Sequence, residues 1–241
     1  AKLRVLRSVN LLAGMGWERW DRSAHREVPV SDEFTAKAGV DVTPADWLTA
    51  RLVYKPSFRR IDDYLTFAHA EHTVVEELTA SELAQGQSAL LRKFDEADRD
   101  RHAVRLSLHV FPIETVTTTL TGEWRSDEYI NSPLGLQQAN SWSLGVDASW
   151  RPADPVAFFG GYVHESIHQK QRSRSRPVTG TTTFDFPDFD WISVHTDTVD
   201  TFHVGANVGL VPGTLDWSVT ASASYALGEI DNRNVGALVS G

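Results

Sequence analysis

Residues 164–168 read HESIH, a His-Glu-x-x-His pattern. This pattern binds zinc in metalloproteases when a helix places both histidines on one face, with the glutamate beside them as general base. The surroundings indicate a strand instead, because Gly160 and Gly161 precede the pattern within an aromatic run. In a strand, His164 and His168 lie ~13 Å apart, too far to share one metal ion. We therefore predict no catalytic residue and no metal site here.

Two charged segments follow this pattern. Residues 169–176 (QKQRSRSR) are basic within an acidic chain and could bind an acidic protein surface or lipopolysaccharide phosphates, or form a solvated loop. Five aspartates stand in the next segment: Asp185, Asp188, Asp190, Asp197 and Asp200. Their oxygens could hold Ca²⁺, but the spacing of an EF-hand is absent. There is also no phosphate-binding loop, kinase signature or nucleophile elbow.

The elements around these residues alternate between apolar and polar side chains. In residues 215–227, Leu215, Trp217 and Val219 fall on one face, while Asp216 and Ser218 fall on the other. Period two indicates an extended strand, and ~9–11 residues suffice to cross a bilayer when the strand is tilted. The same pattern predicts about nine long strands: residues 3–20, 34–42, 47–60, 102–111, 115–126, 140–151, 156–162, 201–210 and 215–227.

The connections between these strands are of two kinds. Short turns, such as residues 43–46 and 111–114, alternate with longer polar segments, of which the longest lie near residues 61–99 and 169–195. The segment VVEELTASELAQ within the first of these is compatible with a short helix. Outer-membrane barrels have this asymmetry, with short turns on the periplasmic rim and longer loops outside.

Composition agrees with a membrane barrel and excludes other classes. The 241 residues include eight Trp, eleven Phe and five Tyr, yet no apolar run reaches the ~20 residues of a membrane helix. The net charge of -9 and the absence of a basic stripe argue against nucleic-acid binding. There is no Cys, which excludes disulfides and the C-x-x-C-H attachment of c-type haem.

We therefore predict an all-β fold, an antiparallel transmembrane β-barrel that occupies residues 1–241 as a single outer-membrane region. An odd number of strands does not match the even counts of single-chain bacterial barrels. For this reason we expect the chain to be part of a larger barrel.

Four segments of the chain carry a resemblance to a known family: GWERWDR at 16–22, LRKFDEADRDR at 91–101, QRSRSR at 171–176 and the hairpin DTVDTFHVGANVGLVPGTLDWSVTASASY at 197–225. These segments resemble the MtrB/PioB family of outer-membrane barrels. The resemblance covers nearly the whole chain but only the later part of a family barrel. The Cys pair near the N-terminus of some members has no counterpart here.

This resemblance implies a partner and a function. Family barrels sheathe a multihaem c-type cytochrome in the bacterial outer membrane, so that electrons cross between periplasm and exterior. The partner would carry the haem, and this chain would bind no cofactor itself. The lumen side of the predicted strands would then face the partner, with these candidate residues: Arg51, Lys55, Arg105, His109, Glu123, Asp147, His203, Asn207 and Asp216.

Two other functions are left open by the sequence. A porin-like channel for solutes would show the same alternation, with the polar face lining water. An enzyme, either a barrel hydrolase or a zinc protease, has the HESIH pentapeptide as its sole support, and we expect the protein not to be an enzyme.

Overall fold

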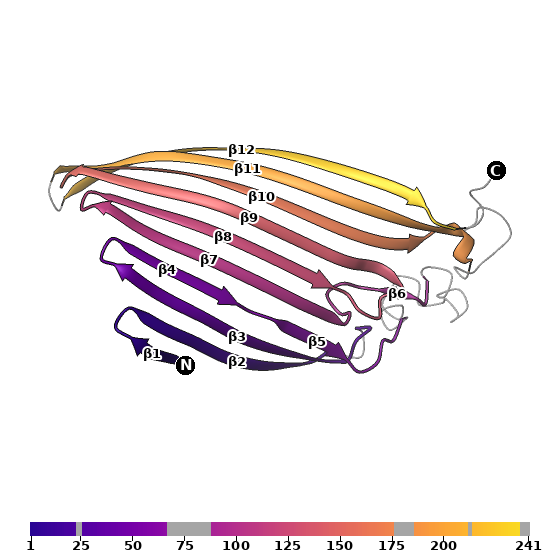
Figure 1. Ribbon diagram of the computed structural model, residues 1–241. Helices are drawn as coiled ribbons and strands as arrows, with labels where there is room; N and C mark the ends of the chain where they lie inside the picture. The colour runs from indigo at the N-terminus through magenta and orange to yellow at the C-terminus, as the bar shows by residue number, and fades with distance from the viewer. Residues whose placement is uncertain (23–25, 67–87, 176–185, 212–213, 237–241) are drawn as a thin grey trace.

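The computed structural model describes residues 1–22, 26–66, 88–175, 186–211 and 214–236. These residues form one sheet in which the wall strands are all antiparallel, in the order β1-β2-β3-β4-β7-β8-β9-β10-β11-β12 (Figure 1). The strands are β1 (Lys2–Leu6), β2 (Val9–Asp21), β3 (Val30–Ala45), β4 (Leu48–Tyr54), β5 (Ser57–Ile61), β6 (Leu91–Arg92), β7 (Arg99–Ile113), β8 (Val116–Glu128), β9 (Leu134–Ala153), β10 (Val156–Arg174), β11 (Asp190–Val211) and β12 (Leu215–Asn234).

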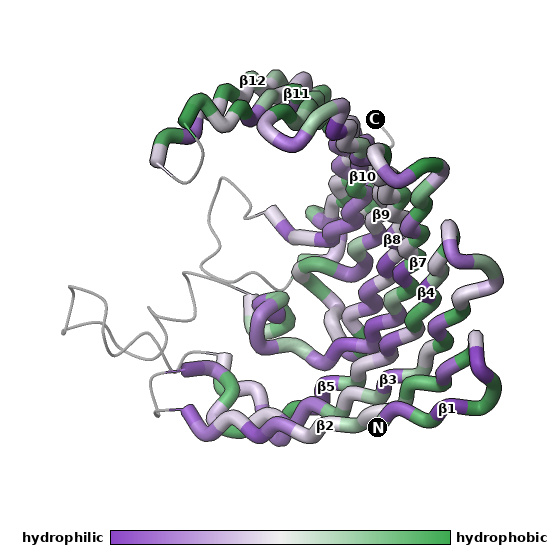
Figure 2. The backbone as a smooth tube through the Cα atoms, turned by 90° about the vertical axis from the view of Figure 1, so that its left-hand side faces the viewer, coloured by the Kyte–Doolittle hydropathy of each residue, from purple (hydrophilic) through white to green (hydrophobic). Residues whose placement is uncertain are grey.

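The antiparallel sheet confirms the predicted fold class. Figure 2 shows the sheet curling like a barrel wall, from β2 and β3 through β7 to β10 and over to β11 and β12. Within the described residues β1 and β12 are not paired with each other, so the wall is an open arc. A single 3₁₀ turn, η2 (Pro187–Phe189), is the only helical element in that part of the chain, and no helix there could cross a membrane.

Two predicted strands are divided in the structure. Residues 3–20 form the hairpin of β1 and β2, with Leu6 paired to Val9 across a turn. Residues 47–60 form β4 and β5, which both pair with β3 and β7 and so occupy one row of the wall. The break lies at Pro56, which has no N–H for the ladder. The wall therefore has ten rows instead of nine.

The predicted loop at residues 169–195 is wrong at both ends. β10 runs to Arg174 and β11 begins at Asp190, and the two strands pair without a register shift. Beyond the bilayer both faces of a strand contact water, so the alternation that marks a strand disappears. Of the predicted loop at residues 61–99, residue 99 begins β7 and residues 91–92 form β6. The helix-compatible segment VVEELTASELAQ lies outside the described residues.

The apolar side chains lie on the outside of this molecule. Along β9 the exposed residues Trp142, Leu144 and Trp150 share one face, and the register places Trp124, Leu120 and Val116 of β8 beside them. Buried apolar side chains in the described residues are few: Val28, Ala97, Tyr129, Leu134 and Ala139. A continuous apolar face of this size is typical of a surface covered by lipid.

Aromatic residues bound this apolar band at two levels. Trp142 and Trp150 lie eight residues apart on β9, and Trp217 and Tyr225 lie eight apart on β12. At ~3.3 Å per residue, eight residues span ~26 Å of strand, close to the ~25 Å apolar band of an outer-membrane barrel. β10 continues eight residues past Ser166, which pairs with Trp142 at the outer aromatic level, to Arg174, so the wall extends beyond the apolar band on the long-loop side.

Candidate functional site on the concave face

The strand register assigns the polar side chains to the concave face of the wall. Asp41 pairs with Arg51, Arg51 with Ser107, and Arg105 with Glu123, so these residues lie side by side across four rows. Because the alternation is kept across each pair, this face is opposite to the tryptophans of the apolar band. The concave face therefore lines the space that the curled wall surrounds (Figure 2).

The register places eight of the nine candidate lumen residues on this face, and six of the nine form polar contacts with another side chain on it. Arg51 donates two hydrogen bonds to Asp41, at 2.6 and 2.9 Å, and Arg105 forms an ion pair with Glu123. The ring of His109 lies 3.2 Å from the hydroxyl of Thr119.

A longer contact joins two of the candidates across three strands. The Nε2 atom of His203 in β11 lies 3.2 Å from Asp147 in β9, although β10 runs between these strands. Gly161 is the β10 residue that pairs with both of them. A Cβ at this position would lie 2.5 Å from Asp147 Oδ1 and from His203 Cε1, so only glycine lets the two side chains meet.

The remaining candidates are not drawn into such contacts. Lys55 follows β4 and its N–H donates to the carbonyl of Ala103. Asn207 pairs with Ser218 and Asp216 with Gly209 near the short-turn end of β11 and β12. The nine residues thus form a distributed polar surface, and no compact catalytic centre results.

The HESIH pattern lies in the middle of β10, as a strand. His164 and His168 point to the convex face with Tyr162, whereas Glu165 points to the concave face. His164 contacts Asp200 at 2.8 Å and His168 contacts Thr196 at 3.2 Å. The three groups that a zinc protease needs are therefore on opposite faces of a sheet.

The four of the five aspartates that the structure describes do not converge either. Asp190 is buried and accepts hydrogen bonds from Arg172, at 2.7 Å, and from Arg174, at 2.5 Å. Asp197 and Asp200 point to opposite faces of β11, and Asp185 lies outside the described residues. Among the described residues, no group of three or more His, Cys, Asp or Glu side chains could hold a metal ion.

Asp190 and its two arginines join the ends of β10 and β11. Burial opposes the ionisation of Asp190, but the hydrogen bonds and charges of Arg174 and Arg172 hold the pKa of its carboxyl below the usual range. Most of the QKQRSRSR segment is therefore strand, and two of its arginines are in ion pairs at the end of a hairpin. Lys170, Arg172 and Arg174 point to the convex face, away from the lumen.

A second polar region lies on the concave face at the long-loop end of the wall. We call this region, formed by the segment 88–98 and the part of the wall that it contacts, the mouth. The chain from Ser88 to Asp98 turns back onto the sheet there, and β6 pairs in parallel with the start of β9. Arg59 holds this segment by donating hydrogen bonds to three carbonyls, those of Phe94, Asp95 and Ala97, at 2.5, 2.9 and 2.8 Å. Ala97 packs against Tyr129 and Ala139 in a small apolar core.

Ion pairs also connect this segment to the loop before β3. Lys93 pairs with Glu27, and Arg26 pairs with Glu96 and with Asp95. Burial and a hydrogen bond that the protonated Glu96 donates to the carboxylate of Glu27 raise the pKa of Glu96. The segment 88–98 is thus fixed on the concave side by several independent contacts.

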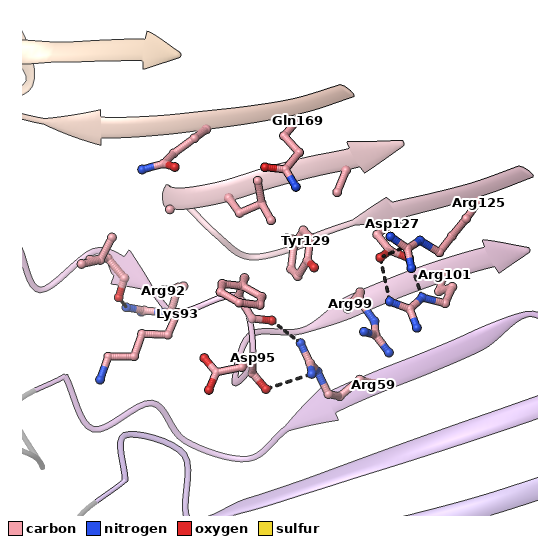
Figure 3. Close-up of a pocket in the computed structure, with 16 residues that line it drawn as sticks. Arg59, Arg92, Lys93, Asp95, Arg99, Arg101, Arg125, Asp127, Tyr129 and Gln169 are labelled. Carbon is pink, nitrogen blue, oxygen red and sulfur yellow. Dashed lines mark hydrogen bonds and ion pairs between the residues drawn. The ribbon is translucent and has the colours of Figure 1, made fainter. Parts of the chain in front are cut away.

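A pocket of about 850 Å³ lies between this segment and the wall. Figure 3 shows Arg59, Arg99 and Arg101 beside Tyr129, with Gln169 of β10 on the same lining. Burial and the neighbouring charge of Arg99 lower the pKa of Arg59, and burial raises the pKa of Tyr129. Arg101 forms two hydrogen bonds to Asp127, at 2.6 and 2.8 Å, and this pair raises the pKa of Arg101.

This pocket was not predicted from the sequence. Arg99 and Arg101 lie just before the predicted strand at residues 102–111, and they continue its alternation on the lumen side, which was a signal for cations there. Their meeting with Arg59 depends on the return of the segment 88–98, which has no periodic pattern.

Together, the exposed apolar band, the aromatic levels and the polar concave face define an outer-membrane β-barrel protein. The family model described as "Putative outer membrane beta-barrel porin, MtrB/PioB" matches residues 1–235, and the chain belongs to this family. This confirms the resemblance and places the protein in the bacterial outer membrane.

Individual proteins give more distant matches. The chain is 24% identical over 183 residues to Outer membrane protein MtrB of Shewanella baltica (strain OS185), which covers 76% of this chain and 24% of that protein. It thus spans about a quarter of the length of this relative. Two solved structures cover nearly all of the chain. A loop-deletion mutant of OmpT of Vibrio cholerae has a TM-score of 0.42 at 9% identity, covering 95% of this chain and 61% of its own. OccK11 of Pseudomonas aeruginosa has a TM-score of 0.34 at 11% identity, covering 96% and 66%.

Proposed function

We propose that this chain is part of an outer-membrane barrel that sheathes and positions a multihaem c-type cytochrome for electron transfer across the membrane. The observation that carries the proposal is the concave face, where polar and charged side chains follow one another across neighbouring rows from β3 to β8. The partner is the one that the resemblance to the MtrB/PioB family implies, and the match of the family model to residues 1–235 supports that resemblance.

The side chains of this face suit contact with a protein. Ion pairs such as Arg51 with Asp41 and Arg105 with Glu123 run along the wall, so their charges neutralise each other where water would be displaced. Pairing reduces the cost of removing charges from water when a partner covers them. Small residues such as Gly145 and Ser143 leave room for the partner to approach closely.

The haem of the partner supplies the redox chemistry. The residues of this chain form an apolar outer surface toward lipid and a polar inner surface toward the cytochrome, and they keep the lipid away from the haems. With no Cys in its sequence, the chain has no C-x-x-C-H motif to attach a c-type haem of its own.

We also propose that the arc is completed by further strands into a larger barrel. The outward half of β12 carries apolar residues such as Tyr225 and Leu227 on its convex face, and its second edge has no partner among the described residues. Unpaired backbone N–H and C=O groups are costly in lipid, at several kcal/mol each. A closed wall removes this cost.

The test is co-purification from the native host. The complete protein is tagged, extracted in mild detergent and purified, and the visible spectrum and a haem-stained gel are recorded. A Soret band carried by a separate polypeptide at a fixed ratio supports the sheath. A colourless, heat-modifiable barrel obtained under conditions that preserve other haem complexes would contradict it.

A porin-like channel is the second candidate, and the mouth favours it. The segment 88–98 turns inward onto the wall, as a constriction of a solute channel would. Planar-bilayer recordings of the complete barrel distinguish the two functions. A solute channel gives steady ion conductance in the form isolated from the host. A sheath blocks ion flow in that form and conducts ions only after its partner has been removed.

A further inference from the structure

The pocket at the mouth has more positive than negative charge. Its lining includes six cations, Arg59, Arg92, Lys93, Arg99, Arg101 and Arg125, and two carboxylates, Asp95 and Asp127. Glu33 and Glu27 pair with Arg99 and Lys93 from outside the lining, and with them six cations still face four carboxylates.

Two of the arginines are arranged as an anion site would require. Arg59 donates to three neutral carbonyls, and it forms no ion pair with the described residues. Arg99 is only 9% exposed; its Nη2 donates to Glu33 at 2.8 Å, but its Nε has no hydrogen-bond partner in the described part of the chain. A buried N–H donor without an acceptor is costly, and such groups commonly receive their acceptor from water or a ligand.

The cations that remain accessible lie around these two. Arg125 contacts Asp127 at 3.7 Å and its side chain is 46% exposed, while Arg92 donates to carbonyls and stacks over the ring of Tyr64. Gln169 and Gln171 add neutral donors from β10 on the same lining. Guanidinium groups bind carboxylate and phosphate oxygens with two parallel hydrogen bonds. A ligand that carries either a carboxylate or a phosphate group would therefore fit this pocket.

We propose that this pocket binds an oxyanion group, a phosphate or a carboxylate, at the mouth of the barrel. The ligand has two possible sources: a free anion that enters from outside, or a carboxylate presented by a protein inside the barrel. The site depends on the side chains of this chain alone and holds whether the barrel is a sheath or a channel.

The experiment is calorimetric titration of the complete barrel, freed of any partner, with inorganic phosphate and, separately, succinate at constant ionic strength. We expect saturable binding of at least one probe at one site. Arg125→Gln and Arg92→Gln should each weaken it about tenfold, equivalent to about 1.4 kcal/mol. The control is Lys37→Gln, which removes a cation of the same face in β3, outside the lining of the pocket, and should leave the affinity unchanged.

Absence of saturable binding by both probes, or equal affinity in the wild type and both pocket variants, would overturn the proposal. Comparison of the barrel with and without its co-purified partner then identifies the source. Phosphate binding that is lost in the complex indicates a carboxylate of the partner, and phosphate binding retained in the complex indicates a free anion.

Discussion

Val146→Arg tests which face of the wall meets the lipid. Val146 lies four residues from Trp142 and four from Trp150, and all three share the convex face of β9. At ~3.3 Å per residue it is ~13 Å along the strand from each aromatic level, at the centre of the apolar band. An arginine at the bilayer midplane costs ~2–4 kcal/mol. At ~1.4 kcal/mol per factor of ten, the ratio of folded to unfolded protein should fall roughly 30- to 700-fold.

The assay is folding of the complete protein into lipid vesicles, followed over a urea titration by the heat-modifiable shift of the folded band. Leu144 is two residues closer than Val146 to Trp142, and Ala148 is two residues closer to Trp150. Leu144→Arg and Ala148→Arg should therefore lower the free energy of unfolding by less than Val146→Arg does. Ser143→Arg is the matched control, because Ser143 is on the concave face between Glu123 and Glu165. It should change the stability by less than ~1 kcal/mol. An equal loss at Ser143 and Val146 would refute the face assignment.

Three further predictions concern the mouth, the hairpin end and the HESIH pattern. Arg59→Ala removes the donor to three carbonyls of the segment 88–98, so amide hydrogen exchange in that segment should be at least about tenfold faster. The control is Arg60→Ala on the convex face, which should leave the exchange rate of the segment unchanged. The pKa of Asp190 is lowered in the folded protein. Asp190 should therefore stabilise the ends of β10 and β11 at a pH above ~3.9, the pKa of an aspartate in the unfolded chain. This stabilisation should be lost as the pH falls through the lower pKa of Asp190 in the folded protein. Asp190→Asn should abolish this dependence in proteolysis measured from pH 2 to 6, and an unchanged pH profile would refute the assignment. Treatment with 1,10-phenanthroline, or Glu165→Gln, should leave folding and stability unaltered, and stoichiometric zinc in the purified protein would contradict the strand geometry of His164 and His168.

The strands were predictable where one side of the wall meets lipid. In β8, β9 and β12 the membrane imposes apolar residues at every second position. The predicted ranges 140–151 and 215–227 lie within the observed strands, and the range 115–126 begins one residue before β8. Where the wall extends beyond the lipid, this constraint ends. The outer halves of β10 and β11 are held by backbone pairing and by Asp190 with its arginines, which leave no periodic signal.

Local breaks were harder to place. Arg7 interrupts the apolar face of residues 3–20, and the structure makes its turn there, at residues 7–8. Pro56 divides β4 from β5 but leaves the row intact, because Ala36 donates to the carbonyl of Pro56 and the pairing with β3 resumes at Ser57. Arg7 and Pro56 both mark in the sequence where a strand is interrupted. Pairing with the neighbouring strands decides whether the chain then reverses in a turn or continues in the same row after a short break.

The concave polar surface was predicted residue by residue, while the contacts within it were not. Alternation places His203 and Asp147 on the lumen side, but their contact depends on the order of β9, β10 and β11 and on Gly161 between them. The pocket at the mouth depends likewise on Arg59 and on carbonyls about 35 residues later, a pairing that no local pattern contains.

The most direct test of the sheath is crosslinking from inside the wall. A photo-reactive amino acid is placed at Asn207, on the concave face, or at Val208, its convex neighbour, in the complete protein in its native host. After illumination, the sheath predicts a haem-staining adduct from position 207 and none from position 208. Absence of a haem-staining adduct at 207, with the barrel folded and its cytochromes expressed, would contradict the central claim.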